Sequence, residues 1–321
     1  MNTRSVIESR PLSELPLTAV SPSRPYAPVG LVIAAFAAVY LIWGSTYLGI
    51  RVAIDSIPPL LMAGTRFIIA GSVLYAVMRL RGVPRPEPGH WKSAAIIGSL
   101  LLLAGNGGVC WAQQTVPSGV TALIVAAVPL WILLVEWLRR GGQRPTLRVV
   151  LGVIIGMAGV AIIISSRNAL GHPVVNPIAA VVLVGANICW AFGSVYSRQA
   201  SRPQSPLLAI AMQMLTGGAL QLLAGLMLGE GYDFDPSHIT AASAWAFAYL
   251  TLIGSLVGFT AYVWLLQVST PARVSTHAYV NPLVAVLLGH FILSEPFPQS
   301  ILLAGALILA AVILITRPSR S

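Results

Sequence analysis

The stretch IWGSTYLGIRVA, residues 42–53, closes an apolar run that begins at Val29 and is long enough to cross a bilayer. Small and polar residues, GSTY at 44–47, occupy the last part of this run, and Arg51 lies at its exit. A similar stretch, CWAFGSVYSRQA, recurs at residues 189–200. A polar patch that appears twice in membrane helices of one chain indicates an internal repeat.

The composition of the chain is typical of a protein whose solvent is lipid. Of its 321 residues, 56% are hydrophobic and 9% are charged, and the mean hydropathy is +0.82. A soluble domain carries about 25% charged residues, so this chain cannot cover a surface that faces water. A spanning helix needs about 20 mostly apolar residues. Ten segments qualify: 29–50, 58–80, 91–113, 118–138, 147–166, 175–197, 205–229, 240–266, 272–292 and 299–316. We predict an all-α polytopic membrane protein with ten transmembrane helices.

The basic residues predict the orientation of the chain. With the amino terminus inside, 16 of the 19 Lys and Arg residues fall in inner segments, whereas Arg51 and Arg167 fall outside. Cationic residues accumulate on the cytoplasmic side, so we expect both termini there. The net charge of +10 is then a topology signal, and no nucleic-acid partner is expected. Residues 1–28 lack the apolar core of a signal peptide and predict a disordered cytoplasmic tail.

Two shifts of the sequence against itself support the repeat. A shift of 149 residues places GSTY at 44–47 over GSVY at 193–196, and a shift of 153 places Pro129 over Pro282. The repeat unit has five spans. Because this number is odd, the second copy must enter the membrane from the opposite side.

The two copies are residues 29–166 and 175–316. Inverted repeats are a signature of transporters that open a central site to one side and then to the other. The duplicated small and polar patch then predicts one gate near each face of the membrane. The alternative is that its glycines only mediate close helix packing.

Seven stretches together resemble one family: IWGSTY, PPLLMAGTRF, GNGG, TVPSG, AAVPL, WAFGSVYSR and YVNPLVAVLLG. From the first span to the tenth, the chain resembles a ten-helix member of the drug/metabolite transporter superfamily with two EamA-type repeats. The resemblance implies a bacterial inner-membrane exporter whose cavity is lined mainly by spans 1, 3, 4, 6, 8 and 9. It does not imply one substrate, because this superfamily exports amino acids, nucleosides, drugs and other metabolites.

Polar side chains are expensive in hydrocarbon and normally face the interior of a helix bundle, where aromatic side chains can join them. The candidate substrate-binding residues of these two kinds are Trp43, Tyr47, Asn106, Trp111, Gln113, Trp190, Ser194, Tyr262, His277, Tyr279 and Asn281. Small residues and prolines that could act as hinges or gates are Gly44, Ser45, Gly193, Pro129 and Pro282. On the third span, Asn106, Cys110 and Gln113 share one helical face. Each of these amides could instead bond a neighbouring helix and never meet a substrate.

Arg66 is the only Arg well inside a span. An intramembrane Arg is a functional candidate by default. The resemblance, however, places the second helix outside the cavity, so we expect a structural charge that caps carbonyls or bonds the first helix.

The sequence therefore predicts a secondary transporter, not an enzyme, that exports small organic metabolites by alternating access. Its aromatic residues favour aromatic, zwitterionic or cationic solutes, and the resemblance implies amino acids, especially aromatic or neutral ones, or drug-like solutes. Its expected partners are a small-molecule substrate and the lipid bilayer, and its oligomeric state stays open. No metal or other cofactor is expected, because there is no CxxC motif, Cys/His cluster or Walker loop. Two alternatives are an intramembrane enzyme that uses Ser194 and His277, and a sensor that binds a solute without moving it.

Overall fold

The structure is a computed structural model that describes residues 27–139, 146–166, 175–232, 234–269, 271–274, 276–295 and 298–316. Except for its last two residues, the tail predicted at residues 1–28 lies outside this part of the chain, as does Arg167.

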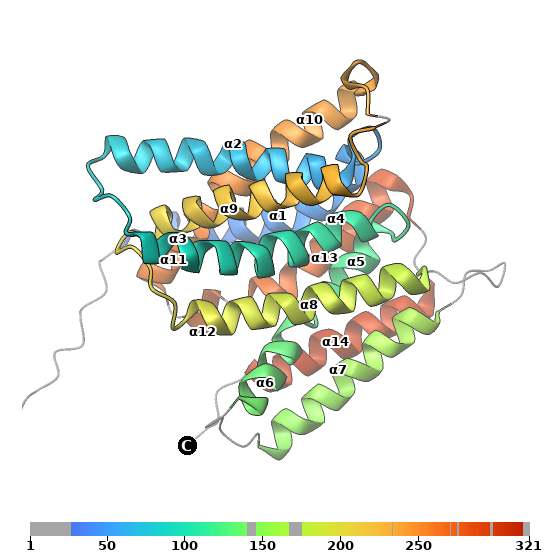
Figure 1. The fold of residues 1–321 in the computed structure, drawn as a ribbon. Coiled ribbons are helices and arrows are strands. Elements are labelled where there is room, and N and C mark those ends of the chain that lie inside the picture. The colour runs from blue at the N-terminus through green and yellow to red at the C-terminus, as the bar shows by residue number, and fades with distance from the viewer. Residues whose placement is uncertain are drawn as a thin grey trace, which may run out of the picture.

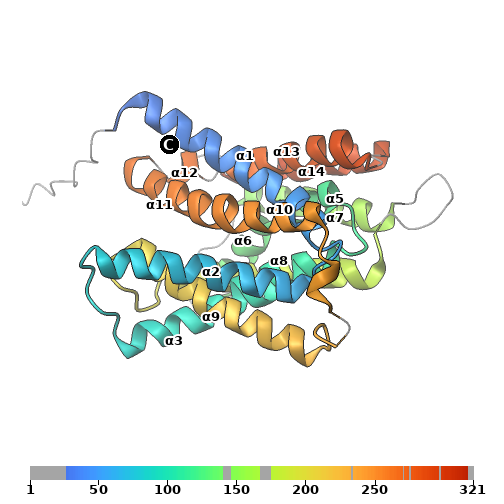
Figure 2. The ribbon, with the colours of Figure 1, turned by 90° about the horizontal axis from the view of Figure 1, so that it is seen from above.

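The described residues form helices that run roughly along a common direction (Figures 1 and 2). In chain order these are α1 (Val29–Ala53), α2 (Pro59–Leu80), α3 (Pro88–Ile97), α4 (Gly108–Ala112), α5 (Ser118–Val125), α6 (Val128–Leu138), α7 (Leu147–Ser165), α8 (Pro177–Ser197), α9 (Pro206–Met227), α10 (Ala241–Tyr249), α11 (Gly258–Val268), α12 (Pro271–Val274), α13 (His277–Leu293) and α14 (Gln299–Thr316). A short 3₁₀ turn, Pro236–His238, precedes α10. Eight spans in this part of the chain are long and apolar enough to cross a membrane, and the two formed by α13 and α14 are shorter. The predicted all-α membrane fold is confirmed.

The third and eighth spans share an irregularity. Residues Gly98–Gly107 join α3 to α4 as a π-helix, and Leu250–Val257 join α10 to α11 in the same way. π-Helical turns are rare and are frequent at functional sites. The shift of 153 residues that relates Pro129 to Pro282 places these two segments over one another, so the repeat extends to the departures from regular helix.

The fourth span is interrupted, whereas the ninth runs unbroken through its matching proline. α5 ends at Val125 and α6 begins at Val128, with Pro129 in the first turn of α6. A proline has no N–H to continue the preceding helix. Pro282, by contrast, lies inside the continuous helix α13. The role of either proline as a hinge stays a prediction.

The most extensive helix contacts join equivalent spans of the two repeats. α2 packs most extensively on α9, and α7 on α14, which pairs span 2 with span 7 and span 5 with span 10 (Figure 1). α1 packs on α10, α11 and α13, whereas α8 packs on α4, α5, α6 and the π-helical segment of the third span. Each first span of a repeat therefore contacts the third and fourth spans of the other repeat. The result is two intertwined bundles: bundle A contains spans 1, 8 and 9, and bundle B contains spans 3, 4 and 6.

The extensive contacts between bundles A and B involve one short helix, α5, which packs on α13 and on α1. The other half of the fourth span, α6, packs mainly on α8 inside its own bundle. The bundles are therefore held together at one end. We call it the Arg51 end, because Arg51 lies in the last turn of α1 there.

Candidate functional site

Three rings of bundle A pack around Trp43. The ring centroid of Trp43 lies 5.2 Å from that of Phe259 and 5.0 Å from that of Tyr262. It also lies 5.3 Å from the imidazole of His277, which is 5.7 Å from Tyr262. Three of the predicted binding residues thus meet in one cluster, and Phe259 joins them. These half-buried rings can stack on flat groups and attract cations.

Glycines make room for the indoles of both bundles. A Cβ at Gly258 would lie 2.5 Å from Nε1 of Trp43, and a Cβ at Gly105 would lie 2.8 Å from a ring carbon of Trp190. Gly105 and Gly258 correspond under the shift of 153 residues. Each repeat therefore places a tryptophan of its first span on the equivalent glycine of the other repeat.

Polar contacts fix α1 against α13 beside this cluster. The hydroxyl of Tyr40 bonds that of Thr276, and the amide of Asn281 faces the carbonyl oxygens of His277 and Tyr40, to which its nitrogen can donate. Gly44 allows this close approach, because a Cβ there would lie 2.6 Å from Cβ of Val284. Asn281 is thus placed next to the ring cluster.

Asn106 faces the second span. Its Oδ1 accepts a hydrogen bond from Nη2 of Arg66 at 3.1 Å and another from Sγ of Cys110 at 3.6 Å. Arg66 is only 3% exposed, and its guanidinium also lies 4.3 Å from the ring centre of Phe67. Arg66 therefore bonds a side chain of the third span, whereas we expected it to cap carbonyls or to bond the first helix. Among the described residues it forms no ion pair.

Buried amides satisfy carbonyls where the helices are irregular. Nδ2 of Asn187 donates to the carbonyl of Ile124 at 2.8 Å, next to the break in the fourth span. Nε2 of Gln221 donates to the carbonyl of Leu102 at 2.8 Å, within the π-helical part of the third. Gln221 was not among the predicted residues; its signal is an amide in a largely apolar span, which also holds Gln213. Gln113 is fully buried, and neither atom of its amide has a partner among the described residues.

The other predicted residues lie in helix contacts. Tyr47, Trp111 and Tyr279 pack on the largest apolar cluster, and Gly193 lies against Leu100 and Leu101 of the third span. The hydroxyl of Ser45 bonds that of Tyr249 at 2.6 Å, which ties the first span to the eighth. Ser194 is half-buried on α8 and makes no hydrogen bond to His277.

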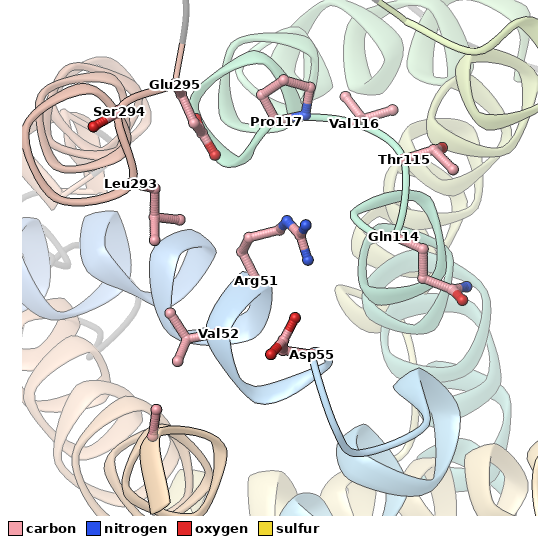
Figure 3. Close-up of a pocket in the computed structure, with 11 residues that line it drawn as sticks. Arg51, Val52, Asp55, Gln114, Thr115, Val116, Pro117, Leu293, Ser294 and Glu295 are labelled. Carbon is pink, nitrogen blue, oxygen red and sulfur yellow. The ribbon is translucent and has the colours of Figure 1, made fainter. Parts of the chain in front are cut away.

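Charged side chains gather around a cavity of about 500 Å³ at the Arg51 end (Figure 3). Arg51 and Asp55 come from the end of α1, Gln114 and Thr115 from the link between α4 and α5, and Glu295 follows α13. None of these five was a predicted site residue. The sequence held one signal for this site. Arg51 is one of the few basic residues on the predicted outer side of the membrane.

Glu295 bridges the two bundles at the floor of this cavity. It is 8% exposed, and its carboxylate accepts hydrogen bonds from the backbone N–H of Ser118 at 2.7 Å and of Gly119 at 3.1 Å. Those N–H groups begin α5, where a helix lacks internal partners and favours an anion. Gly289 leaves room for the contact, because a Cβ there would lie 2.4 Å from the carboxylate.

Glu230 forms the same kind of cap elsewhere. Its carboxylate accepts hydrogen bonds from the backbone N–H groups of Leu60 and Leu61 at the start of α2. Within the described residues, no group of three His, Cys, Asp or Glu side chains could hold a metal ion.

Comparisons with known proteins agree with this architecture. The sequence matches the EamA-like transporter family twice, over residues 30–165 and 177–317. The uncharacterized inner membrane transporter YedA of Escherichia coli K12 is 40% identical over 283 residues, which cover 88% of this chain and 89% of that protein. The probable terminal-alkyne amino-acid exporter of Streptantibioticus cattleyicolor is 26% identical over 86% of this chain and 90% of that protein.

A crystal structure that is 21% identical covers 90% of this chain and 96% of its own with a TM-score of 0.60, which supports the fold alone. The family pattern occupies both halves of the sequence, and the identity to the E. coli protein extends over most of the chain. The chain is therefore a membrane transporter that belongs to the EamA-like family of the drug/metabolite transporter superfamily.

Proposed function

We propose that this transporter is a secondary carrier of the bacterial inner membrane that exports small organic solutes by alternating access. The observation that carries the proposal is the contact pattern of the two bundles, whose described residues meet extensively only through α5. Two similar bundles that are closed at one end can separate there and close at the other.

The orientation predicted from the basic residues puts the Arg51 end on the periplasmic side. The structure then represents a state closed toward the periplasm, with Glu295 bonding the start of α5 across the closure. Outward opening separates α5 from α13 and breaks these bonds. The interruption between α5 and α6 lets one half of the fourth span move while the other keeps its contacts with α8.

The rings on the first, sixth and eighth spans support aromatic or neutral amino acids and drug-like solutes as substrates. The printed name of the S. cattleyicolor relative supports export of an amino-acid-like solute. Catalysis by Ser194 and His277 has no support from the geometry, because Nδ1 of His277 contacts the carbonyl of Val274 and its ring packs on Trp43 and Tyr262.

Counterflow in proteoliposomes tests the proposal. Vesicles are loaded with one unlabelled solute from a panel of amino acids, nucleosides and a cationic dye, and entry of its labelled form is followed. We expect transient accumulation of at least one solute, and a fall of about tenfold or more, the equivalent of 1.4 kcal/mol, in the Trp43→Ala variant. Trp190→Ala and Asn281→Ala are expected to act in the same direction.

Trp245→Ala is the matched control, because Trp245 is 78% exposed on α10 and should leave exchange unchanged. Folded protein that binds a solute of the panel but exchanges none would contradict the carrier and favour a sensor.

A further inference from the structure

The cavity at the Arg51 end carries charges that the ring cluster lacks. Its wall presents the guanidinium of Arg51 beside the carboxylate of Asp55, and Glu295 lies opposite (Figure 3). Gln114 and Thr115 also line it, but their side chains donate to the carbonyls of Trp111 and Ala112. Its volume of about 500 Å³ lies within the range of small-molecule sites.

Glu295 is already bound by backbone N–H groups, whereas Arg51 has Asp55 beside it but is in ion-pair contact with no described residue. Glu295 accepts two backbone N–H bonds at the start of α5, where the helix dipole places about half a positive charge. Arg51 forms no ion pair in the described part of the chain, although its side chain is only half-exposed and extends into the cavity (Figure 3). A guanidinium in this position can donate two hydrogen bonds to the carboxylate of a ligand.

The placement of two charges at the end of α1 selects among ligands. Arg51 lies in the last turn of α1 and Asp55 in the turn that follows the helix, and both face the cavity (Figure 3). An α-amino acid carries its carboxylate and ammonium on a single carbon, so its complement is a cation next to an anion on one wall. The carboxylates of Asp55 and Glu295 would repel a dianion, and the guanidinium of Arg51 would repel a dication. Both kinds of ligand are therefore disfavoured.

We infer that this cavity is a periplasmic subsite for zwitterionic, amino-acid-like solutes, with the carboxylate on Arg51 and the ammonium beside Asp55. The inference rests on the proposed export function, and it places the periplasmic exit of the transport pathway at this cavity. Trp43 lies eight residues before Arg51 on the same helix, which is about 12 Å at 1.5 Å per residue. The subsite is therefore separate from the ring cluster, and a solute reaches it after leaving the rings.

Binding to the purified full-length chain tests the assignment independently of transport. The probes are L-leucine and L-tryptophan, their methyl esters, which lack the carboxylate charge, and their N-acetyl derivatives, which lack the ammonium charge. We expect the wild type to bind at least one free amino acid about tenfold more tightly than its methyl ester, as for the loss of one charged hydrogen bond. In Arg51→Gln the affinities for the free amino acid and its methyl ester should agree within about twofold. Arg51→Lys should restore part of the difference in affinity.

Two further variants sharpen the result. Asp55→Asn should weaken the amino acid and its ester together and leave the N-acetyl derivative unchanged. Arg85→Gln removes the same charge from an exposed site in the loop between α2 and α3, and should leave every ratio as in the wild type.

The assignment is overturned if no free amino acid of the panel binds more tightly than its ester, or if Arg51→Gln keeps the wild-type ratio. Equal weakening of acid and ester in Arg51→Gln also overturns it, since Arg51 would then only stabilise this end of the bundle. A failure of the proposed export function would give a different result. If binding is selective and depends on Arg51 but no counterflow occurs, the subsite assignment holds and the carrier function is contradicted.

Discussion

The carboxylate of Glu295 lies 2.7 Å from the backbone nitrogen of Ser118, and this hydrogen bond joins bundle A to bundle B at the Arg51 end. The two residues are 177 positions apart in the sequence. One comes from the end of the ninth span, and the other begins the fourth. A charged acceptor at the first N–H groups of a helix is a favourable contact, so the outward opening that we propose would have to break it.

Replacement of Glu295 by Gln is expected to loosen the closure while it keeps the shape of the side chain. The loss of charge weakens the bonds to the start of α5 and should lower the free energy of unfolding by about 1–3 kcal/mol. It should also raise the rate at which an impermeant thiol reagent labels a cysteine introduced at Val116, which is only 1% exposed in the closed end. Both are measured in a background without Cys110 and Cys189.

Glu230→Gln is the matched control for this change, because Glu230 caps α2 within the pair formed by α2 and α9. It should lower the free energy of unfolding by a similar amount and leave labelling at residue 116 unchanged. Equal labelling in both variants would contradict the role of Glu295 in closure.

Gly258→Ala is expected to displace Trp43. The added methyl would lie 2.5 Å from the indole nitrogen, so the ring cluster must shift, at a cost of about 1–3 kcal/mol for overpacking. Counterflow per folded molecule should fall together with the melting temperature. Gly185→Ala serves as the control, since a Cβ at Gly185 meets no atom within 4 Å; if the two variants behave alike, Trp43 is not held by this packing.

Arg66 and Asn106 are expected to be coupled in stability. Asn106→Leu leaves a buried guanidinium without its acceptor and should destabilise the protein by about 3 kcal/mol or more. Arg66→Met removes the charge, so the double variant Arg66→Met/Asn106→Leu should be more stable than Asn106→Leu alone. Chemical or thermal unfolding of the four proteins gives the coupling energy; additive effects would show that the 3.1 Å contact contributes nothing.

Single cysteines test the orientation of the chain. We expect an impermeant maleimide to label Tyr232→Cys in intact cells, because Tyr232 is exposed after α9 on the predicted periplasmic side. Arg85→Cys, exposed after α2, should react only once the cells are opened. The reverse pattern would invert the topology and place the charged cavity in the cytoplasm.

The spans were predictable because an apolar run of fixed length is a local property of the sequence. The expected segments 118–138 and 299–316 coincide with the helical spans, and the other ends differ by a few residues. The repeat was visible through a few shared residues, since each copy must form the same intertwined contacts.

The partners of the polar side chains were not predictable in the same way. A helical face follows from spacing, but the neighbour of that face depends on how distant spans pack. Asn106 and Cys110 do share a face, and that face meets Arg66 of the second span. Glu295 lies beyond a helix end, where no periodic pattern marks it, and its acceptor role appears only when the start of α5 is brought beside it.

Distances between paired spin labels across the two bundles test alternating access most directly. One pair, Ala241→Cys at the start of α10 with Ile178→Cys at the start of α8, spans the Arg51 end outside the charged cavity; the other, Tyr196→Cys with Gln267→Cys, spans the opposite end, and all four sites are exposed. On addition of a solute that shows counterflow, the account predicts a new population in which the first distance is longer and the second shorter. Exchange of that solute with both distances unchanged, or with both ends opening together, would contradict the account.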